Sequence, residues 1–304
     1  MAGVLSRLTA LLVVLVMAPL VPGVATRTRA MLTGRRGAPV WQLYADVWKL
    51  LRRGVVYSHT VTAVFKFTPV VQLAVIIVAA LLVPLNGRAS FIGFSGDVVA
   101  FAYLIALGRF VLVLGALDTG SSFEGMGSSR EVTFAALAEF GFFVALAALS
   151  IAARDLSMGG MLGPALATRW SVSAPALVMV AMSLFVLLLA EGSRSPVDDP
   201  TTHLELTMIH EVMILDHSGP DLAVILYASA LKLSVLGAVI VRVIAPADIS
   251  VVARFAALIL GLPAIGVVIG VVESSMARLR LPKVPLYLAG GTALSAFGLI
   301  LLLR

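Results

Sequence analysis

The amino-acid sequence predicts an all-α fold, a polytopic bundle of about eight transmembrane helices in one integral membrane domain covering residues 1–304. The first observation is composition: 60% of residues are hydrophobic and 12% charged, with a mean hydropathy of +1.06, whereas soluble domains average about 25% charged residues. The second is that eight apolar runs approach the roughly 17–25 residues that a helix needs to cross a bilayer. They lie at 3–22, 69–85, 98–117, 131–152, 174–190, 221–244, 252–272 and 284–303.

The first of these spans has two interpretations. Arg7, the apolar stretch 8–21 and the small residues at 22–25 also fit a secretory signal with its cleavage site. The loop that follows is rich in basic residues, and exporting it would violate the positive-inside rule. This charge pattern favours a retained span with its N-terminus outside.

The loop at 23–68 holds the densest basic segment of the chain: Arg27, Arg29, Arg35, Arg36, Lys49, Arg52, Arg53 and Lys66. Within it, residues 40–53 place Val40, Tyr44, Val47 and Leu51 on one helical face. Two tryptophans and a terminal basic cluster suit an amphipathic helix lying on the cytoplasmic membrane surface. A short helix packed on a partner protein is the alternative.

The later loops complete a consistent topology. With the N-terminus outside, the loops at 23–68, 118–130, 191–220 and 273–283 are cytoplasmic, and they hold most of the lysines and arginines. An even number of spans puts the C-terminus outside as well. We therefore expect a multi-pass protein of the inner (cytoplasmic) membrane.

Composition also excludes several kinds of site. The chain has no cysteine, which excludes disulfides, thiolate-bound iron–sulfur clusters and a cysteine-bound nickel–iron centre in this chain. Its net charge of +6 comes from loops beside apolar spans, and no basic face interleaved with aromatics predicts nucleic-acid binding.

The third cytoplasmic loop carries the strongest local pattern. Between residues 191 and 221 acidic groups outnumber a single Arg194, on the side of the membrane that is normally basic. Docking to a basic partner or a supply of protonatable groups explains such an inversion, and a solvated loop is the simpler alternative. The groups we expect to contact a partner are Arg194, Asp198, Asp199, His203, His210 and Asp216.

This loop, PVDDPTTHLELTMIHEVMILDHSGPDLA, resembles that of the complex I subunit 1 family, in the branch found in formate hydrogenlyases and group 4 membrane-bound nickel–iron hydrogenases. Three other segments agree: GRRGAPVWQLYADVWKLLRRG, LDTGSSFEGMGSSREVTFAALAE and ESSMARLRLPKVP. The resemblance runs from about residue 33 to 285. The chain departs from the family pattern at Leu43, Ala45, Glu124 (where a glycine is usual) and Phe140.

The resemblance implies a non-catalytic membrane subunit of a modular oxidoreductase. Hydrogenase-like large and small subunits and an iron–sulfur subunit would dock on the cytoplasmic loops, and antiporter-like membrane subunits would pack laterally. The chain would hold no cofactor. It would anchor the redox arm and couple electron transfer to proton or sodium translocation.

Ionisable residues inside the spans locate the expected coupling site, because burying one in lipid costs at least roughly 2.5–3.5 kcal/mol. Arg109, Glu139 and Lys232 lie about 12, 12 and 15 Å from the expected cytoplasmic helix ends, so they form a layer suited to a proton relay. Snorkelling or a fixed ion pair is the structural alternative. Four glutamates near the cytoplasmic face would extend the path: Glu191, Glu205, Glu211 and Glu273.

Other kinds of function are less consistent with the sequence. His203 and His210 lie seven residues apart without an HExxH motif, so we expect no metal site. A quinone-site membrane subunit of complex I is the main alternative from the same family. A stand-alone secondary transporter would show inverted repeats, and none is evident. A purely structural anchor without an ion path also remains open.

Overall fold

The computed structural model describes residues 2–87, 89–198, 208–245 and 250–304, and in this part of the chain every regular element is helical. The elements in chain order are α1 (Ala2–Met17), α2 (Leu20–Leu32), α3 (Gln42–Leu51), α4 (Ala63–Leu82), α5 (Asp97–Asp118), α6 (Ser122–Ala153), α7 (Met158–Met161), α8 (Pro164–Glu191), η1 (Glu211–Ile214), α9 (Gly219–Ile244), α10 (Val251–Ser275), η2 (Leu281–Lys283) and α11 (Val284–Leu303). The predicted all-α class is confirmed.

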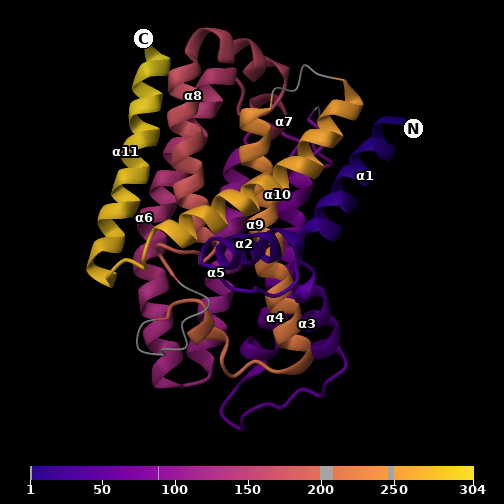
Figure 1. Cartoon of the computed structure of the whole chain (residues 1–304), viewed down its shortest axis with the longest axis vertical. Coiled ribbons are helices and arrows are strands. Elements are labelled where there is room, and N and C mark those ends of the chain that lie inside the picture. The colour runs from indigo at the N-terminus through magenta and orange to yellow at the C-terminus, as the bar shows by residue number, and fades with distance from the viewer. Residues whose placement is uncertain (1, 88, 199–207, 246–249) are drawn as a thin grey trace.

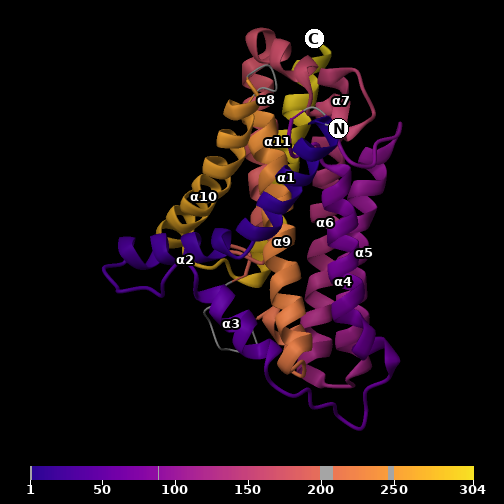
Figure 2. The same ribbon diagram turned by 90° about the vertical axis from the view of Figure 1, so that its right-hand side faces the viewer.

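The long helices form a bundle around α9, which is buried along most of its length. α4, α5 and α6 stand side by side on one flank, and α10 and α2 lie on the other (Figure 2). α11 packs against α6 and α8, and α3 packs against α9. Both chain ends lie at the same end of the molecule (Figure 1), as an even number of spans requires.

The predicted number of spans is confirmed, with one of them broken. Seven of the described helices are long and apolar enough to cross a membrane, and the pair α1 and α2, bent by 42°, makes an eighth if it counts as one span. The expected first span at 3–22 covers α1 and the start of α2, with a break between Met17 and Leu20, and α2 runs on to Leu32.

The break in the first span follows from Pro19, whose ring nitrogen cannot donate a hydrogen bond to the preceding turn. Other helices supply hydroxyl donors to the carbonyls around it: Tyr227 to Leu15 (2.9 Å), Tyr44 to Val16, and Ser234 to Ala18 (3.3 Å). Two of these donors belong to α9 and one to α3, so the bend is fixed by side chains outside it.

Two spans are longer than hydropathy predicted. α6 begins at Ser122 instead of 131, and its 32 residues extend about 48 Å. α8 begins at Pro164 instead of 174 and is kinked at Ser173, two residues before Pro175. The predicted span 174–190 corresponds to the straight part of α8 after this kink.

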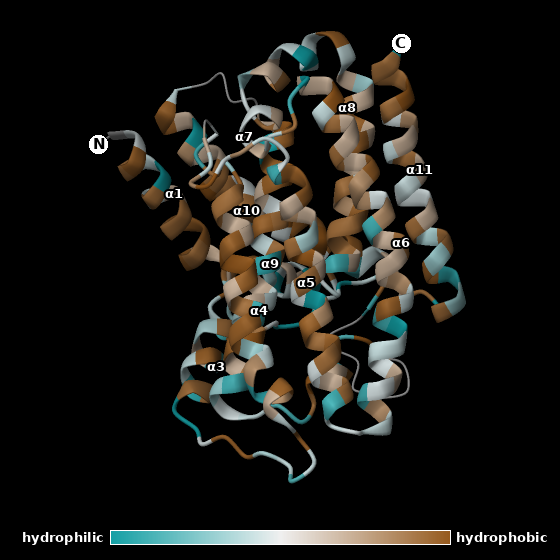
Figure 3. Ribbon diagram, turned by 180° about the vertical axis from the view of Figure 1, so that it is seen from behind, coloured by the Kyte–Doolittle hydropathy of each residue, from teal (hydrophilic) through white to brown (hydrophobic). Residues whose placement is uncertain are grey.

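Hydrophobic residues cover most of the length of the spanning helices, while hydrophilic residues concentrate in loops and at a few turns of α5, α6 and α9 (Figure 3). The expected amphipathic helix is present as α3. Tyr44 and Val47 are partly buried on its bundle side, but Leu51 is exposed. Trp41 and Trp48 are exposed on its outer side, with the Arg52 guanidinium 4.4 Å from the Trp48 ring centre.

Candidate functional site

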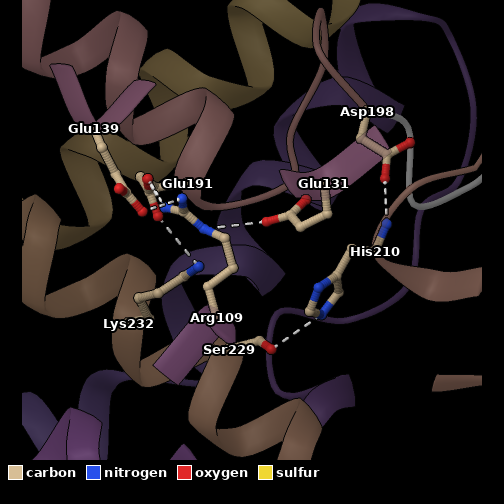
Figure 4. A network of polar contacts seen from close by, with 8 residues as sticks. All are labelled: Arg109, Glu131, Glu139, Glu191, Asp198, His210, Ser229 and Lys232. Carbon is tan, nitrogen blue, oxygen red and sulfur yellow. Dashed lines mark hydrogen bonds and ion pairs between the residues drawn. The ribbon is translucent and has the colours of Figure 1, made fainter. Parts of the chain in front are cut away.

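A single buried guanidinium, that of Arg109 on α5, contacts carboxyl groups from two other helices. Its Nε lies 3.2 Å from Glu131 and its Nη1 lies 2.9 Å from Glu139, both on α6, while its Nη2 contacts Glu191 at the end of α8. Figure 4 shows the three carboxyl groups around the guanidinium. The rigid fork of arginine donors can serve several acceptors at once, which a lysine ammonium does less well.

Lys232 on α9 completes this group, which we call the inner cluster: Arg109, Glu131, Glu139, Glu191 and Lys232. The Lys232 ammonium lies 3.5 Å from the second oxygen of Glu191. Three carboxyl groups therefore share two cations. The cluster therefore has one more carboxyl group than it has cations, and a buried charge is costly unless it is paired and hydrogen-bonded.

The position of each glutamate follows from helix geometry. Glu131 and Glu139 are eight residues apart on α6, so they lie on the same face about 12 Å apart along the axis. Arg109 reaches both because its guanidinium lies between them (Figure 4). Glu191 is the last residue of α8, and its side chain is only 4% exposed. Side chains from α5, α6 and α8 thus meet around the Arg109 guanidinium.

Exposure differs sharply across the inner cluster. The side chains of Arg109 and Glu191 are buried, whereas that of Glu139 is 39% exposed. Glu139 lies in the apolar part of α6, beside Phe140, which is 64% exposed. The cluster therefore opens on one side of the bundle, along the outer surface of α6.

A small cavity of about 20 Å³ borders the cluster and is lined by Arg109, Glu131, Glu191 and Asp198, among other residues. This volume holds about one water molecule, and the lining offers the several polar partners that a buried water needs. The cavity thus connects the cluster to the loop at 191–220, the third loop, to which Asp198 belongs.

Asp198 organises this loop. One of its carboxylate oxygens accepts hydrogen bonds from the backbone N–H groups of Ile209 (3.2 Å) and His210 (3.0 Å). The other lies 3.0 Å from the Arg278 guanidinium, in the segment between α10 and α11. The His210 ring lies 3.2 Å from the Ser229 hydroxyl on α9. Burial, reinforced by the positive charge of Lys232, lowers the pKa of His210 to about 4.

The remaining expected residues lie around the cluster. Arg194 lies 3.6 Å from Glu273 on α10. Glu211 is partly buried at the start of η1, and Asp216 is exposed after it. Asp199, His203 and Glu205 lie outside the described residues. The structure thus joins four of the expected coupling residues, Arg109, Glu139, Glu191 and Lys232, while Glu211 and Glu273 have other surroundings.

A larger cavity of about 150 Å³ lies between α2, α3, α9 and the third loop. Its lining is mainly apolar, with Pro22, Leu43 and Leu233, and the side chains of Arg194 and His210 are among its polar groups. It has the mixed apolar and polar lining typical of small-molecule sites.

Glu131 is the cluster residue that sequence reasoning missed. It lies at the boundary between the expected loop 118–130 and the expected span 131–152, where a carboxyl group attracts no notice. Its spacing of eight residues from Glu139 was available as an indication, because that spacing places both on one helical face.

Comparisons with known proteins agree on the family. The sequence model of the NADH dehydrogenase family matches residues 6–302. Hydrogenase-4 component C of Escherichia coli (strain K12) is 30% identical over 243 residues, 80% of this chain and 76% of that protein. Formate hydrogenlyase subunit 4 of the same organism is 30% identical over 294 residues, 93% of each chain.

A solved structure shares the fold. One chain of the membrane-bound sulfane sulfur reductase, an archaeal respiratory membrane complex, superposes with a TM-score of 0.83 over 99% of this chain and 100% of that one, at 17% identity. The helical fold of this chain is therefore found in a membrane complex of known structure.

Proposed function

The chain belongs to the NADH dehydrogenase family of membrane proteins, and from that premise we propose that it is the membrane-anchor and ion-coupling subunit of a formate hydrogenlyase or membrane-bound hydrogenase type of complex. The two relatives at 30% identity, a hydrogenase-4 component and a formate hydrogenlyase subunit, support this choice of complex. The chain holds no redox centre of its own and links electron transfer in its partners to ion movement.

The observation that carries this proposal is the inner cluster. Its three carboxyl groups share two cations, Arg109 and Lys232, so a proton or a sodium ion can be gained and lost while the other charges remain paired. Glu139 is the member that can pass the ion on, because its side chain is partly open to the side of α6. The arginine holds the carboxyl groups in place while the proton content of the cluster changes.

The exposure of Glu139 also supports a lateral partner. A carboxyl group facing lipid in a spanning helix is costly, and Val132 and Phe140 form an exposed apolar strip beside it. An antiporter-like membrane subunit packed on this face of α6 would cover the strip and receive the ion from Glu139.

The inner surface is the proposed docking site for the hydrophilic arm, made of hydrogenase-like large and small subunits and an iron–sulfur subunit. Asp198, Arg278, Arg194 and Glu273 tie the third loop to the end of α10 and the segment that follows it, which gives such partners a fixed surface. In this topology the protein lies in the inner membrane with both termini outside. The exposed tryptophans and basic end of α3 rest at the lipid surface.

The test is Glu139→Gln in the intact complex reconstituted in liposomes, with reduced methyl viologen as electron donor. Glutamine keeps the size of the side chain but cannot take up a proton, so we expect assembly and redox turnover to persist while ion uptake per turnover is largely lost. Lys232→Met should act in the same direction. Asp155→Asn, a change of the same chemistry just beyond the other end of α6, is the matched control.

The outcomes separate the proposals. If Glu139→Gln and Lys232→Met both leave ion uptake per turnover unchanged in a normally assembled complex, the chain is a structural anchor. If the purified chain alone moves ions through liposomes without partners, it is a transporter and the subunit proposal fails.

The cavity of about 150 Å³ favours one second candidate, a quinone-site membrane subunit. An apolar chamber with Arg194 and His210 among its lining residues is suited to a ring with polar oxygens and an apolar tail. This candidate predicts quinone-dependent activity of the intact complex that Leu233→Trp, which fills the cavity, abolishes. A complex with no quinone-dependent activity would exclude it.

A further inference from the structure

The face of α6 that carries the inner cluster bears polar groups further towards the inner end of the helix. Glu124, Ser128, Glu131 and Glu139 follow one another at spacings of four, three and eight residues, which place all four on one side of an α-helix. Sequence and structure therefore extend the line of carboxyl groups below the cluster, to the first turn of α6.

Glu124 is fully buried at this inner end, with 0% exposure. One of its oxygens accepts a hydrogen bond from the backbone N–H of Asp216 (3.0 Å). The Thr119 side chain interacts with this carboxyl group, and its other oxygen is buried without a hydrogen bond of normal geometry among the described residues. Buried carboxyl oxygens without a donor are rare in folded proteins and require an explanation such as an unseen water or a functional role.

Ser128 lies one turn further along the same face and is 1% exposed. Its hydroxyl group also has no hydrogen-bond partner in the described part of the chain. Neighbours at spacings of three or four residues have Cβ atoms roughly 5–6 Å apart. The Ser128 hydroxyl hydrogen-bonds neither glutamate in the structure, so it can connect Glu124 to Glu131 only through bridging water.

The surroundings expose one end of this line to the aqueous side. The third loop is held on α6 by the Arg130 guanidinium, which donates to the carbonyl of Met208 (3.0 Å), and by close packing at Gly127, where a Cβ would overlap Val212. This loop covers Glu124 but leaves Asp216 exposed. Protons can thus reach Glu124 from water at Asp216.

We propose that Glu124 is a proton-loading residue that supplies the inner cluster from the inner aqueous phase, a role that rests on the proposed function. Through bridging water, Glu124 gives its proton to the Ser128 hydroxyl, which releases its own proton to the Glu131 carboxylate. Glu131 then loses its charge pairing with Arg109, and the proton is available to Glu139. Glu124 is reprotonated from water beside Asp216, so charge and protons balance over each passage.

A purely structural role for Glu124 is the competing explanation, because one of its oxygens anchors the loop at Asp216. Glu124→Gln separates the two. The glutamine carbonyl still accepts from the Asp216 N–H and keeps the size of the side chain, but it cannot carry a proton. Ser128→Ala removes the hydroxyl link, and Ser129→Ala, at the exposed neighbouring serine, is its matched control.

The experiment uses the intact complex in liposomes, driven by reduced methyl viologen, with proton uptake followed by a pH-sensitive dye in H₂O and in D₂O. We expect Glu124→Gln and Ser128→Ala to slow proton uptake several-fold and to alter its solvent isotope effect, at normal assembly, while Ser129→Ala behaves as the unaltered chain. Glu139→Gln is measured in parallel.

If Glu124→Gln and Ser128→Ala match the unaltered chain in both rate and isotope effect while Glu139→Gln loses uptake, the loading role is wrong and the coupling function stands. If Glu139→Gln has no effect either, the coupling function itself fails. If Glu124→Gln slows uptake without changing the isotope effect, Glu124 is structural.

Discussion

Two of the arginines buried in the described spanning helices, Arg109 and Arg242, have partners that differ in kind. Arg109 on α5 contacts three carboxyl groups. Arg242, near the end of α9 and 1% exposed, donates to the backbone carbonyls of Leu85 and Arg254. The two sites lie about 15 Å apart along α9, because Lys232 precedes Arg242 by ten residues.

This difference in partners decides which chemistry each of the two arginine sites can perform. Backbone carbonyl oxygens do not titrate near neutral pH. The Arg242 site therefore only links α9 by hydrogen bonds to α10 and to the loop after α4. The fit is tight, since a Cβ at Gly87, with φ of +76°, would lie 3.1 Å from the Arg242 Nη1. Carboxyl groups change charge with protonation, so the Arg109 site can do chemistry that the Arg242 site cannot.

Among the changes that test this comparison, Arg109→Met is expected to lower stability the most. It leaves Glu191 and Glu131 buried without their main counter-charge, which costs about 3–5 kcal/mol. We expect a marked fall in the thermal midpoint of the detergent-solubilised complex, measured by a dye-free fluorescence scan. The double variant Arg109→Met with Glu191→Gln should recover part of the loss, because it removes one of the stranded charges. Equal stability of the single and double variants would contradict this account.

Arg242→Met should have a smaller effect of a different kind. Two backbone carbonyls lose a donor, which costs about 1–3 kcal/mol, but no carboxylate is left unpaired. We expect a lower thermal midpoint with unchanged ion uptake per turnover of the assembled complex. Arg242→Lys, which keeps a donor and the charge, should lose less. A loss of ion uptake in Arg242→Met would contradict the distinction between the Arg109 site and the Arg242 site.

A third expected effect concerns the dependence of stability on pH. Burial lowers the pKa of both His210 and His217 to about 4, below the ordinary value of about 6.5. The two neutral histidines therefore contribute fully to the free energy of unfolding above about pH 6.5. This contribution is lost as pH falls towards 4, because the unfolded chain takes up protons that the folded chain does not.

We expect the thermal midpoint of the complex to fall by several degrees between about pH 7 and pH 5, and to fall less when both residues are replaced by asparagine. His59→Asn, at an exposed position, is the control. An equal decline of the thermal midpoint in the unaltered chain, the double variant and His59→Asn would show that the pH dependence of stability comes from groups other than His210 and His217.

The fold was largely predictable because the mean hydropathy of a segment of spanning length can be read directly from the sequence. This average no longer locates the helix ends where a helix continues beyond its apolar part. The first nine residues of α6 contain Glu124 and Arg130, which lower hydropathy, yet tertiary contacts with the third loop keep them helical. The bend at Pro19 was missed for a similar reason, since apolar residues continue on both sides.

The site was predictable in part. The rule that ionisable residues in spans are costly selected Arg109, Glu139 and Lys232, and the structure places Arg109 against Glu139. It pairs Lys232 with Glu191 instead of Glu139, because the rotation of each helix about its axis sets which side chains meet. That rotation comes from packing between helices, which a single sequence does not display. The roles of these residues remain predictions.

The bend between α1 and α2 has a mechanical consequence. Its carbonyls are held by Tyr44 of α3 and by Tyr227 and Ser234 of α9, and the two α9 residues lie on either side of Lys232 along the helix. The bend of the first span is thus tied by hydrogen bonds to the segment of α9 that carries Lys232. A displacement of α1 or α3 would therefore act on the inner cluster through three hydroxyl groups.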